Sequence, residues 1–360
     1  MSKTLHTGEN CRFITEADVI PHARRLPLTR GRQTVTFENA PRITGRYSVV
    51  GEKEGKGPLG KYFHKIVDDD KMHEKTFEKA EIDMLTAAID GAAEDCGLPI
   101  ENIDLLIAGD LLNQITSSSY VAREMNIPYM GVYSACSTMS ESLAVGAAMI
   151  NAGYFENVMC ATASHFATAE RQFRYPLEYG CQRPPYAQWT VTAAGASVIS
   201  AIGNGPKVVS ATFGRVVDFG TNDLNNMGAA MAPAAADTLK RHLFDTGRTV
   251  EDYDLIITGD LGSFGSELFL MLLNDAGIDA GTRHLDCGNI IFSAEQNAVC
   301  GGSGCGCSAV TMNGYILPRM DAGEYNRILF MATGALMSPT AGLQGESIPG
   351  IAHGVVIERR

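Results

Sequence analysis

The chain has 360 residues, of which 45% are hydrophobic and 19% charged, so it can bury the core of one large domain or two medium ones. It carries 29 Lys and Arg against 41 Asp and Glu, and the net charge of −12 argues against a nucleic-acid-binding protein. No window approaches the roughly 18 consecutive apolar residues of a transmembrane helix. The first residues, MSKTLHTGEN, contain no apolar segment of the kind that a secretory signal requires.

The nine cysteines are scattered along the chain, without a CxxC pair and without the density of a disulfide scaffold. This pattern fits a reducing, cytoplasmic compartment. Four of them lie close together in the sequence, at Cys287, Cys300, Cys305 and Cys307, but their spacing matches no usual zinc pattern. We therefore expect packing roles for these thiols and no metal site.

Taken in chain order, the first elements are an extension, a loop, a helix and a strand. Residues 1–30 show no clear periodicity and are expected to form an N-terminal extension. Residues 51–75 are polar and glycine-rich, which predicts a long surface excursion. Apolar residues recur at helical spacing over residues 74–96, and Gly97 is expected to end that helix. The apolar run at residues 103–109 predicts a buried strand.

Two pairs of similar segments indicate an internal duplication. They are DLLIAGDL (104–111) with DLIITGDL (254–261), and AGYFENVMCAT (152–162) with AGEYNRILFMAT (322–333). Duplicated βαβ units predict two similar α/β halves that pack together, with functional sites between their matching loops. We place the halves at residues 31–203 and 204–360.

The segment GVYSACSTMSESLAVGAA (131–148) places one cysteine between a predicted strand and a predicted helix. A cysteine at a helix N-terminus is a typical thiol nucleophile, because the helix dipole and backbone N–H groups favour the thiolate. Thr138 and Glu141 have the spacing of a capping box for the same helix. Cys136 is therefore the candidate nucleophile position.

The duplication and the Cys136 segment, together with TVTAAGASVIS (190–200) and GIAHGVVIERR (350–360), resemble the thiolase fold, in particular β-ketoacyl carrier-protein synthase III. The resemblance implies an α/β protein with two pseudo-repeated halves in a layered αβαβα arrangement, and a homodimer. It also implies two catalytic donors in the second half, a histidine after the strand DLIIT and an asparagine in a Gly-Asn turn. The matching positions here read Gly259-Asp260-Leu261 and Gly302-Ser303-Gly304.

The missing donors predict that the chain does not catalyse condensation, since losing one such donor costs about 10²–10³ in rate. Cys136 is then a vestigial nucleophile. An alternative is an acyltransferase or thioester hydrolase that uses Cys136 with His353 from the C-terminal glycine loop. In the other interpretation, His353 only packs the loop beside the pocket.

Several further segments resemble the stage V sporulation protein AD family: GDLLNQ (109–114), SHFATAERQFRYPLEYG (164–180), MGAAMAPAAADT (227–238), GGSGCGCSAV (301–310), ATGALMSPT (332–340) and ESIPGIAHGVV (346–356). The resemblance implies a protein that binds dipicolinic acid, pyridine-2,6-dicarboxylate. It also implies that the protein acts together with membrane channel proteins, which load the acid into developing spores and release it at germination. The chain would then be cytoplasmic and peripherally associated with the inner membrane of the developing spore. A structural adaptor with a vestigial pocket is a further alternative.

The two pseudo-equivalent turns, 134–138 and 302–308, each precede a predicted helix and would point N–H groups into one cleft that suits a planar dianion. His165, Arg171 or Arg174 could complete the site, and Asn113 could donate to a carboxylate. The expected ligand-binding residues are Asp110, Asn113, Cys136, Ser137, His165, Arg171, Gly302, Ser303 and His353.

Two of these residues have a local alternative role. Asp110 could cap the turn that follows it, because a bare carboxylate would repel a dianion unless it were protonated or bridged by Ca²⁺. His165 could be a structural loop residue. The segment ERQFRYPLEYGCQRPP (170–185) could line the pocket or a dimer interface.

Overall fold

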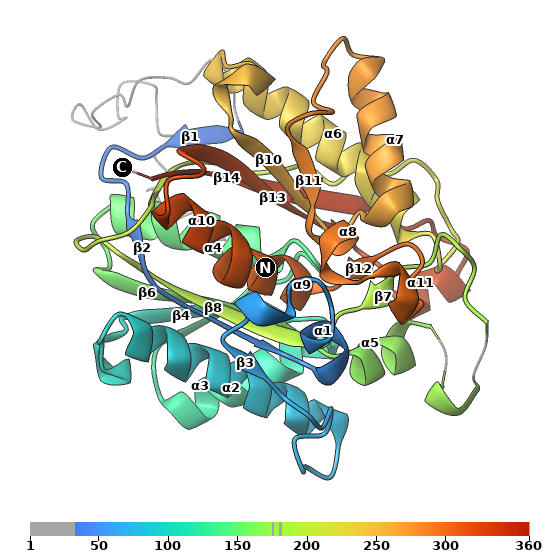
Figure 1. Cartoon of the computed structure of the whole chain (residues 1–360), viewed down its shortest axis with the longest axis horizontal. Helices are drawn as coiled ribbons and strands as arrows, with labels where there is room; N and C mark the ends of the chain where they lie inside the picture. The colour runs from blue at the N-terminus through green and yellow to red at the C-terminus, as the bar shows by residue number, and fades with distance from the viewer. Residues whose placement is uncertain (1–32, 175, 180–181, 360) are drawn as a thin grey trace, which may run out of the picture.

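The structure, a computed structural model, describes residues 33–174, 176–179 and 182–359, and it consists of two stacked α/β halves (Figure 1). The expected extension, residues 1–30, lies outside the described residues. The first half contains β2 (Arg42–Val50), α1 (Glu52–Gly55), β3 (Lys65–Ile66), α2 (Phe77–Asp95), β4 (Leu105–Asp110), α3 (Thr116–Met125), β5 (Tyr129–Gly131), α4 (Thr138–Asn151), β6 (Asn157–Ser164), α5 (Phe166–Phe173), β7 (Trp189–Thr190) and β8 (Ala193–Ser200).

The second half begins with β9 (Lys207–Thr212), so the expected boundary at 203/204 lies in the segment between β8 and β9. Strand β1 (Thr34–Thr36) pairs with β9. The other elements are α6 (Met227–Thr246), β10 (Leu255–Gly259), α7 (Gly262–Asn274), β11 (His284–Asp286), α8 (Cys287–Ile291), β12 (Gly302–Ser303), α9 (Cys305–Thr311), α10 (Leu317–Asp321), β13 (Arg327–Ala335), α11 (Pro339–Leu343) and β14 (Gly350–Glu358).

Within the described residues, the two halves have the same strand topology. The first sheet runs β2-β8-β6-β4-β5 and the second runs β9-β14-β13-β10-β11. If the five strands of each path are numbered in chain order, both sheets have the strand order 1-5-4-2-3. The two sheets meet at one antiparallel pair, Arg42 with Lys207. The repeated sequences occupy matching strands, because β4 corresponds to β10 and β6 to β13.

The helices form the outer and central layers (Figure 1). Helices α2 and α3 cover the outer face of the first sheet, and α6 covers the outer face of the second with α7 beside it. Helices α4 and α9 pack between the sheets, each against strands of both halves. The αβαβα arrangement and the thiolase-like fold class are therefore confirmed. Because α4 and α9 begin beside each other, the loops before them face one site.

Local signals explain where several elements begin and end. Helix α2 starts after Thr76, whose Oγ1 accepts a hydrogen bond from the Lys79 N–H at 3.3 Å. It ends before Gly97, which has the positive φ of +68° that glycine adopts without strain. The expected capping box of α4 is absent: Thr138 Oγ1 donates to the Ala135 carbonyl instead. No helix in the described part of the chain has the length and apolar character needed to cross a membrane.

The prediction that residues 51–75 form a long surface segment is wrong in part, because this segment contributes residues to the core. Leu59 and Phe63 are buried, and the Glu54 side chain is 1% exposed. Glu54 Oε1 accepts a hydrogen bond from the Thr192 N–H at 3.0 Å, so α1 is held against the start of β8. Burial raises the pKa of Glu54 to about 7. Its carboxyl group is thus partly protonated in the folded protein near neutral pH.

Replacing Glu54 with glutamine should change the pH dependence of stability. The folded pKa is raised above the unfolded value, so the proton on Glu54 stabilises the fold below about pH 4.5 and that contribution is lost as pH rises through about 7. Compared with wild type, the Glu54→Gln variant should therefore gain about 3 kcal/mol in unfolding free energy between pH 4.5 and pH 8. Urea denaturation at both pH values measures this difference, and equal differences at both would contradict it.

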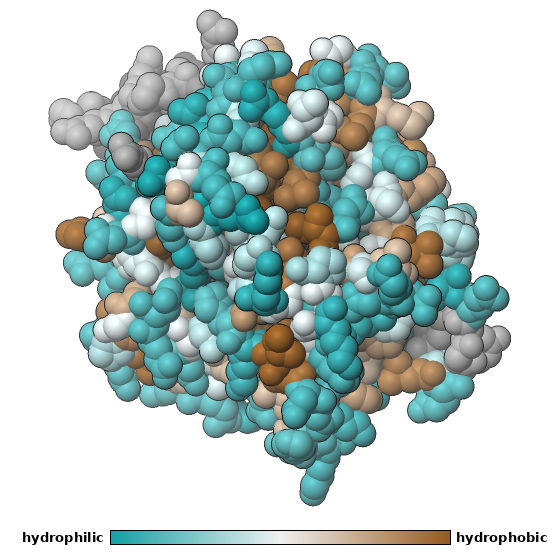
Figure 2. Space-filling model, viewed as in Figure 1, coloured by the Kyte–Doolittle hydropathy of each residue, from teal (hydrophilic) through white to brown (hydrophobic). Residues whose placement is uncertain are grey.

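Outside this core, the face drawn in Figure 2 is mostly hydrophilic, with hydrophobic residues exposed in small patches. Singly exposed apolar side chains are normal for a folded protein. The face in that view therefore does not indicate a functional site. The duplicated loops instead indicate a site in the space between the halves.

Candidate functional site

Cys136 lies in a tight turn between β5 and α4. Ala135 before it has a left-handed φ of +47°, which is uncommon for a residue other than glycine and projects the next residue out of the turn. The turn presses on β13 of the second half, where a Cβ at Gly334 would lie 2.1 Å from the Ser134 carbonyl oxygen. Cys136 is 4% exposed and faces the space between the two halves.

Burial raises the pKa of the Cys136 thiol well above its usual value, and the nearby Asp260 raises it further. The Gly304 N–H and Arg174 act in the opposite direction without reversing the shift. The thiol is therefore protonated at neutral pH. A protonated thiol is a weaker nucleophile than a thiolate.

His353 lies on β14 close to this turn, and both of its ring nitrogens are engaged elsewhere. The Gly214 N–H donates to Nδ1 at 3.2 Å, so Nε2 carries the proton and donates to Ser134 Oγ at 3.1 Å. Burial lowers the pKa of His353 to about 4. Among the described residues no hydrogen bond joins His353 to Cys136, so the expected base is in the neighbourhood of the thiol but is not paired with it.

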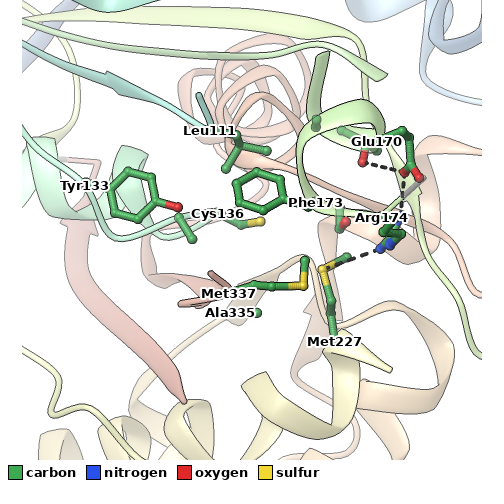
Figure 3. A pocket seen from close by; sticks show the side chains of 13 residues that line it. Leu111, Tyr133, Cys136, Glu170, Phe173, Arg174, Met227, Ala335 and Met337 are labelled. Atoms are coloured by element: carbon green, nitrogen blue, oxygen red, sulfur yellow. Dashed lines mark hydrogen bonds and ion pairs between the residues drawn. The ribbon is translucent and has the colours of Figure 1, made fainter. Parts of the chain in front are cut away.

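A small pocket of about 30 Å³ opens beside Cys136 (Figure 3). In the figure, Leu111 and Phe173 lie on one side of Cys136, with Met337 and Ala335 on the other. The residues that line it come from both halves and are mostly apolar: Leu111, Tyr133, Ala135, Cys136, Ala169, Glu170, Phe173, Arg174, Thr190, Met227, Ser303, Ala335 and Met337. Cys136 and Ser303 were expected to share a site, and the structure brings them together.

One wall of the pocket carries a buried group of charges. Arg174 Nη1 lies 2.5 Å from Glu170 Oε1, and Arg183 Nη2 lies 2.8 Å from Glu170 Oε2. Thr190 Oγ1 also donates to Glu170, and Arg174 Nη2 contacts the Met227 sulfur at 3.5 Å. The Arg174 side chain is only 4% exposed. Two guanidinium groups against one carboxylate leave a net charge of about +1 beside an apolar cavity.

Sequence reasoning named the neighbouring arginine as the first choice, and the structure corrects it. Arg171 points to the surface of α5 and pairs with Glu78, with 47% of its side chain exposed. Arg174, weighed only as the alternative, is the arginine that lines the pocket. The sequence holds no local signal that separates the two arginines, because Arg174 follows the last residue of α5 and has non-helical backbone angles.

Three other expected residues are buried in structural roles instead of lining the pocket. Asp110 accepts hydrogen bonds from Leu112 N, Ser118 N and Ser118 Oγ, which is the local capping role. Ser137 Oγ donates to the Ala332 carbonyl at 2.7 Å and accepts from His353 N, so it joins the two halves. His165 caps α5 through Nδ1 and donates from Nε2 to the Asp70 carbonyl at 2.7 Å.

The remaining expected residues lie close to the pocket without lining it. Gly302 is buried in β12, where a Cβ would meet Ile291 and Val191. Asn113 lines a second, outer hollow of about 370 Å³. This hollow shares Tyr133, Phe173 and Met337 with the inner pocket, so the two are neighbours separated by these side chains.

The fold and the cysteine turn define the class of this protein: a thiolase-fold α/β protein with a pocket at the nucleophile position. Among solved structures, it is similar to 3-oxoacyl-[acyl-carrier-protein] synthase III from Aquifex aeolicus, with a TM-score of 0.55 and 14% identity over 89% of this chain and 100% of that one. Human mitochondrial 3-ketoacyl-CoA thiolase gives a TM-score of 0.58 and 12% identity over 92% and 100%. These likenesses concern the fold alone.

The family is defined by sequence. Residues 31–358 match the family described as Stage V sporulation protein AD. The Stage V sporulation protein AD of Bacillus subtilis (strain 168) is 47% identical over 329 residues, which cover 91% of this chain and 97% of that protein. The chain belongs to the stage V sporulation protein AD family.

Proposed function

We propose that this protein binds dipicolinate in the Cys136 pocket, as a non-catalytic component of dipicolinate uptake into the developing spore and its release at germination. The observation that carries the proposal is the buried Arg174 guanidinium at the edge of a mostly apolar pocket. A pocket of this kind suits a flat aromatic acid, because its walls cover the ring while the cation binds a carboxylate.

The polar groups of the pocket can be matched to the chemistry of pyridine-2,6-dicarboxylate. The net positive charge of Arg174, Arg183 and Glu170 favours one carboxylate. Leu111 and Phe173 provide apolar surface for the ring. Ser303 also lines the pocket and is a further polar residue there.

The absence of catalysis is also part of this proposal. It is supported by the raised pKa of the Cys136 thiol and by the engagement of His353 with Ser134 and Gly214. Asp260 stands after β10, where the synthase resemblance would place a histidine, and burial raises its pKa well above its usual range. The imidazole that polarises the thioester in the synthases is thus missing at this position.

Calcium does not fit the protein groups of this pocket. Within the described residues, Glu170 is the one carboxylate that lines it, and two arginines already neutralise that group. Ca²⁺ prefers six to eight oxygen ligands, so the protein alone does not supply a calcium site here. We infer that the free dicarboxylate is the form bound, and that Ca²⁺ competes by neutralising the charge that Arg174 recognises.

Isothermal titration calorimetry with dipicolinate tests the proposal. The expected result is saturable binding to wild-type protein, and weaker apparent binding when Ca²⁺ is added in excess over the ligand. An absence of heat change at millimolar dipicolinate would contradict the function. An acyl adduct on Cys136 after incubation with acyl-CoA, seen by intact mass and lost in Cys136→Ala, would instead favour an acyltransferase or hydrolase.

Assembly completes the proposal. We propose a homodimer formed through the edge of the first sheet, since β5 pairs with β4 on one side and has no partner strand on the other among the described residues. The membrane channel proteins of the same sporulation system are the proposed partners, with peripheral attachment at the inner membrane of the developing spore. Light scattering measures the dimer, and a monomer at micromolar concentration would argue against it.

A further inference from the structure

Tyr133 is a pocket residue that sequence reasoning did not single out. It lies between β5 and the Cys136 turn, and it lines both the inner pocket and the outer hollow. In Figure 3 its hydroxyl points toward Cys136 from the opposite side of the pocket to Arg174 and Glu170. The two ends of the pocket therefore present different polar groups, a guanidinium at one end and a phenol at the other.

The Tyr133 hydroxyl is available to a ligand. Tyr133 is 41% exposed, and among the described residues its hydroxyl makes no hydrogen bond to the protein, so it is free to donate to a ligand. Burial raises the pKa of Tyr133, and the nearby acidic groups Cys136, Cys305 and Asp110 raise it further. The phenol therefore keeps its proton at every ordinary pH and can only act as a neutral donor or acceptor.

Among the described residues that line the pocket, Arg174 at the opposite end is the one cation. Cys136 and Cys305, which lie near Tyr133, pack in an apolar cluster with Leu111, Ala135 and Ala169. An anionic oxygen placed at this end would find the Tyr133 O–H as its side-chain donor. A hydrogen bond from a neutral donor to a charged acceptor in such surroundings is stronger than one between neutral groups.

We propose that Tyr133 is the second anchor of the ligand and makes the pocket selective for a dicarboxylate over a monocarboxylate. One carboxylate pairs with Arg174, the ring lies against the apolar walls, and the other carboxylate accepts a hydrogen bond from the Tyr133 hydroxyl. This inference rests on the proposed function and adds to it the residue that distinguishes ligands with one carboxylate from ligands with two.

The test compares two ligands and three proteins. Dipicolinate has both carboxylates, whereas picolinate, pyridine-2-carboxylate, lacks one. In the Tyr133→Phe variant, which removes a single oxygen atom, affinity for dipicolinate should fall about tenfold or more while affinity for picolinate stays unchanged. The matched control is Tyr129→Phe, since Tyr129 on β5 has a buried, unpaired hydroxyl and does not line either hollow.

The outcomes separate this inference from the function on which it rests. If wild type binds neither ligand, the proposed function fails and the role of Tyr133 fails with it. If wild type binds dipicolinate but Tyr133→Phe weakens both ligands equally, or neither, the function stands and the second anchor is wrong. Circular dichroism of the variants shows whether the fold is intact, and an equal loss with Tyr129→Phe would indicate a general packing effect that overturns the assignment.

Discussion

Replacing Arg174 with glutamine should abolish most dipicolinate binding. Arg174 is the one cationic side chain that lines the pocket within the described residues, and it is nearly fully buried. Removing one partner of a buried, hydrogen-bonded charge pair costs about 2–5 kcal/mol, which corresponds to a loss of affinity of about thirtyfold or more. Calorimetric titration of dipicolinate into the Arg174→Gln variant measures this loss.

The matched control lies three residues away on the same segment. Arg171 pairs with Glu78 at the surface, so Arg171→Gln removes the same charge from the chain without touching the pocket. This control should bind dipicolinate within about twofold of wild type, since exposed ion pairs contribute little. Equal binding by the two variants would mean that the ligand is held elsewhere. Loss in Arg171→Gln alone would restore the assignment made from the sequence.

Removing the carboxylate of Glu170 should have a large effect on stability. This group accepts contacts from Arg174 and Arg183 and a hydrogen bond from Thr190, and its side chain is 5% exposed. Glu170→Gln would leave the buried Arg174 and the partly exposed Arg183 without a counter-charge, and an uncompensated buried charge costs about 3–5 kcal/mol. We expect a loss of that size in the free energy of unfolding, measured by urea denaturation.

Glu78→Gln is the control for this second prediction. It breaks the ion pair between Glu78 and Arg171, in which both side chains are partly exposed, and should change stability by less than about 1 kcal/mol. If the two variants were equally stable, the prediction would be wrong, because the two arginines would then not need the Glu170 carboxylate as a counter-charge. A dipicolinate concentration that restores the stability of Glu170→Gln would support binding beside these arginines.

The sequence was sufficient for the position of Cys136 but not for the state of its thiol. The run from Tyr133 to Thr138 and the helical pattern after it place a cysteine before a helix, which is a local property of the chain. Whether that thiol is ionised depends on Asp260, Gly304 and Arg174, three residues that come from distant segments. A local sequence pattern does not predict the pKa of the thiol, because burial in the folded protein makes the largest contribution to its shift.

The choice between Arg171 and Arg174 shows the same division. Both belong to one short segment, and Arg174 is the residue at which α5 ends, with φ −126° and ψ −80° outside the helical range. The direction of a side chain at such a position follows the path of the chain and not a helical period. Asp110, Ser137 and His165 were placed in the correct region, but their hydrogen bonds to backbone groups turn them away from the pocket.

By itself, the sequence determined the duplication, the two α/β halves and the cysteine turn, because repeated strands and glycine positions are recorded in the order of residues. The resemblance of its motifs also led to the correct family. Only the tertiary structure decided which polar side chains face the pocket, that Glu54 belongs to the core, and that Arg174 and Tyr133 stand at opposite ends of the cavity. These properties depend on burial and on contacts between residues far apart in the chain, which periodicity and spacing do not encode.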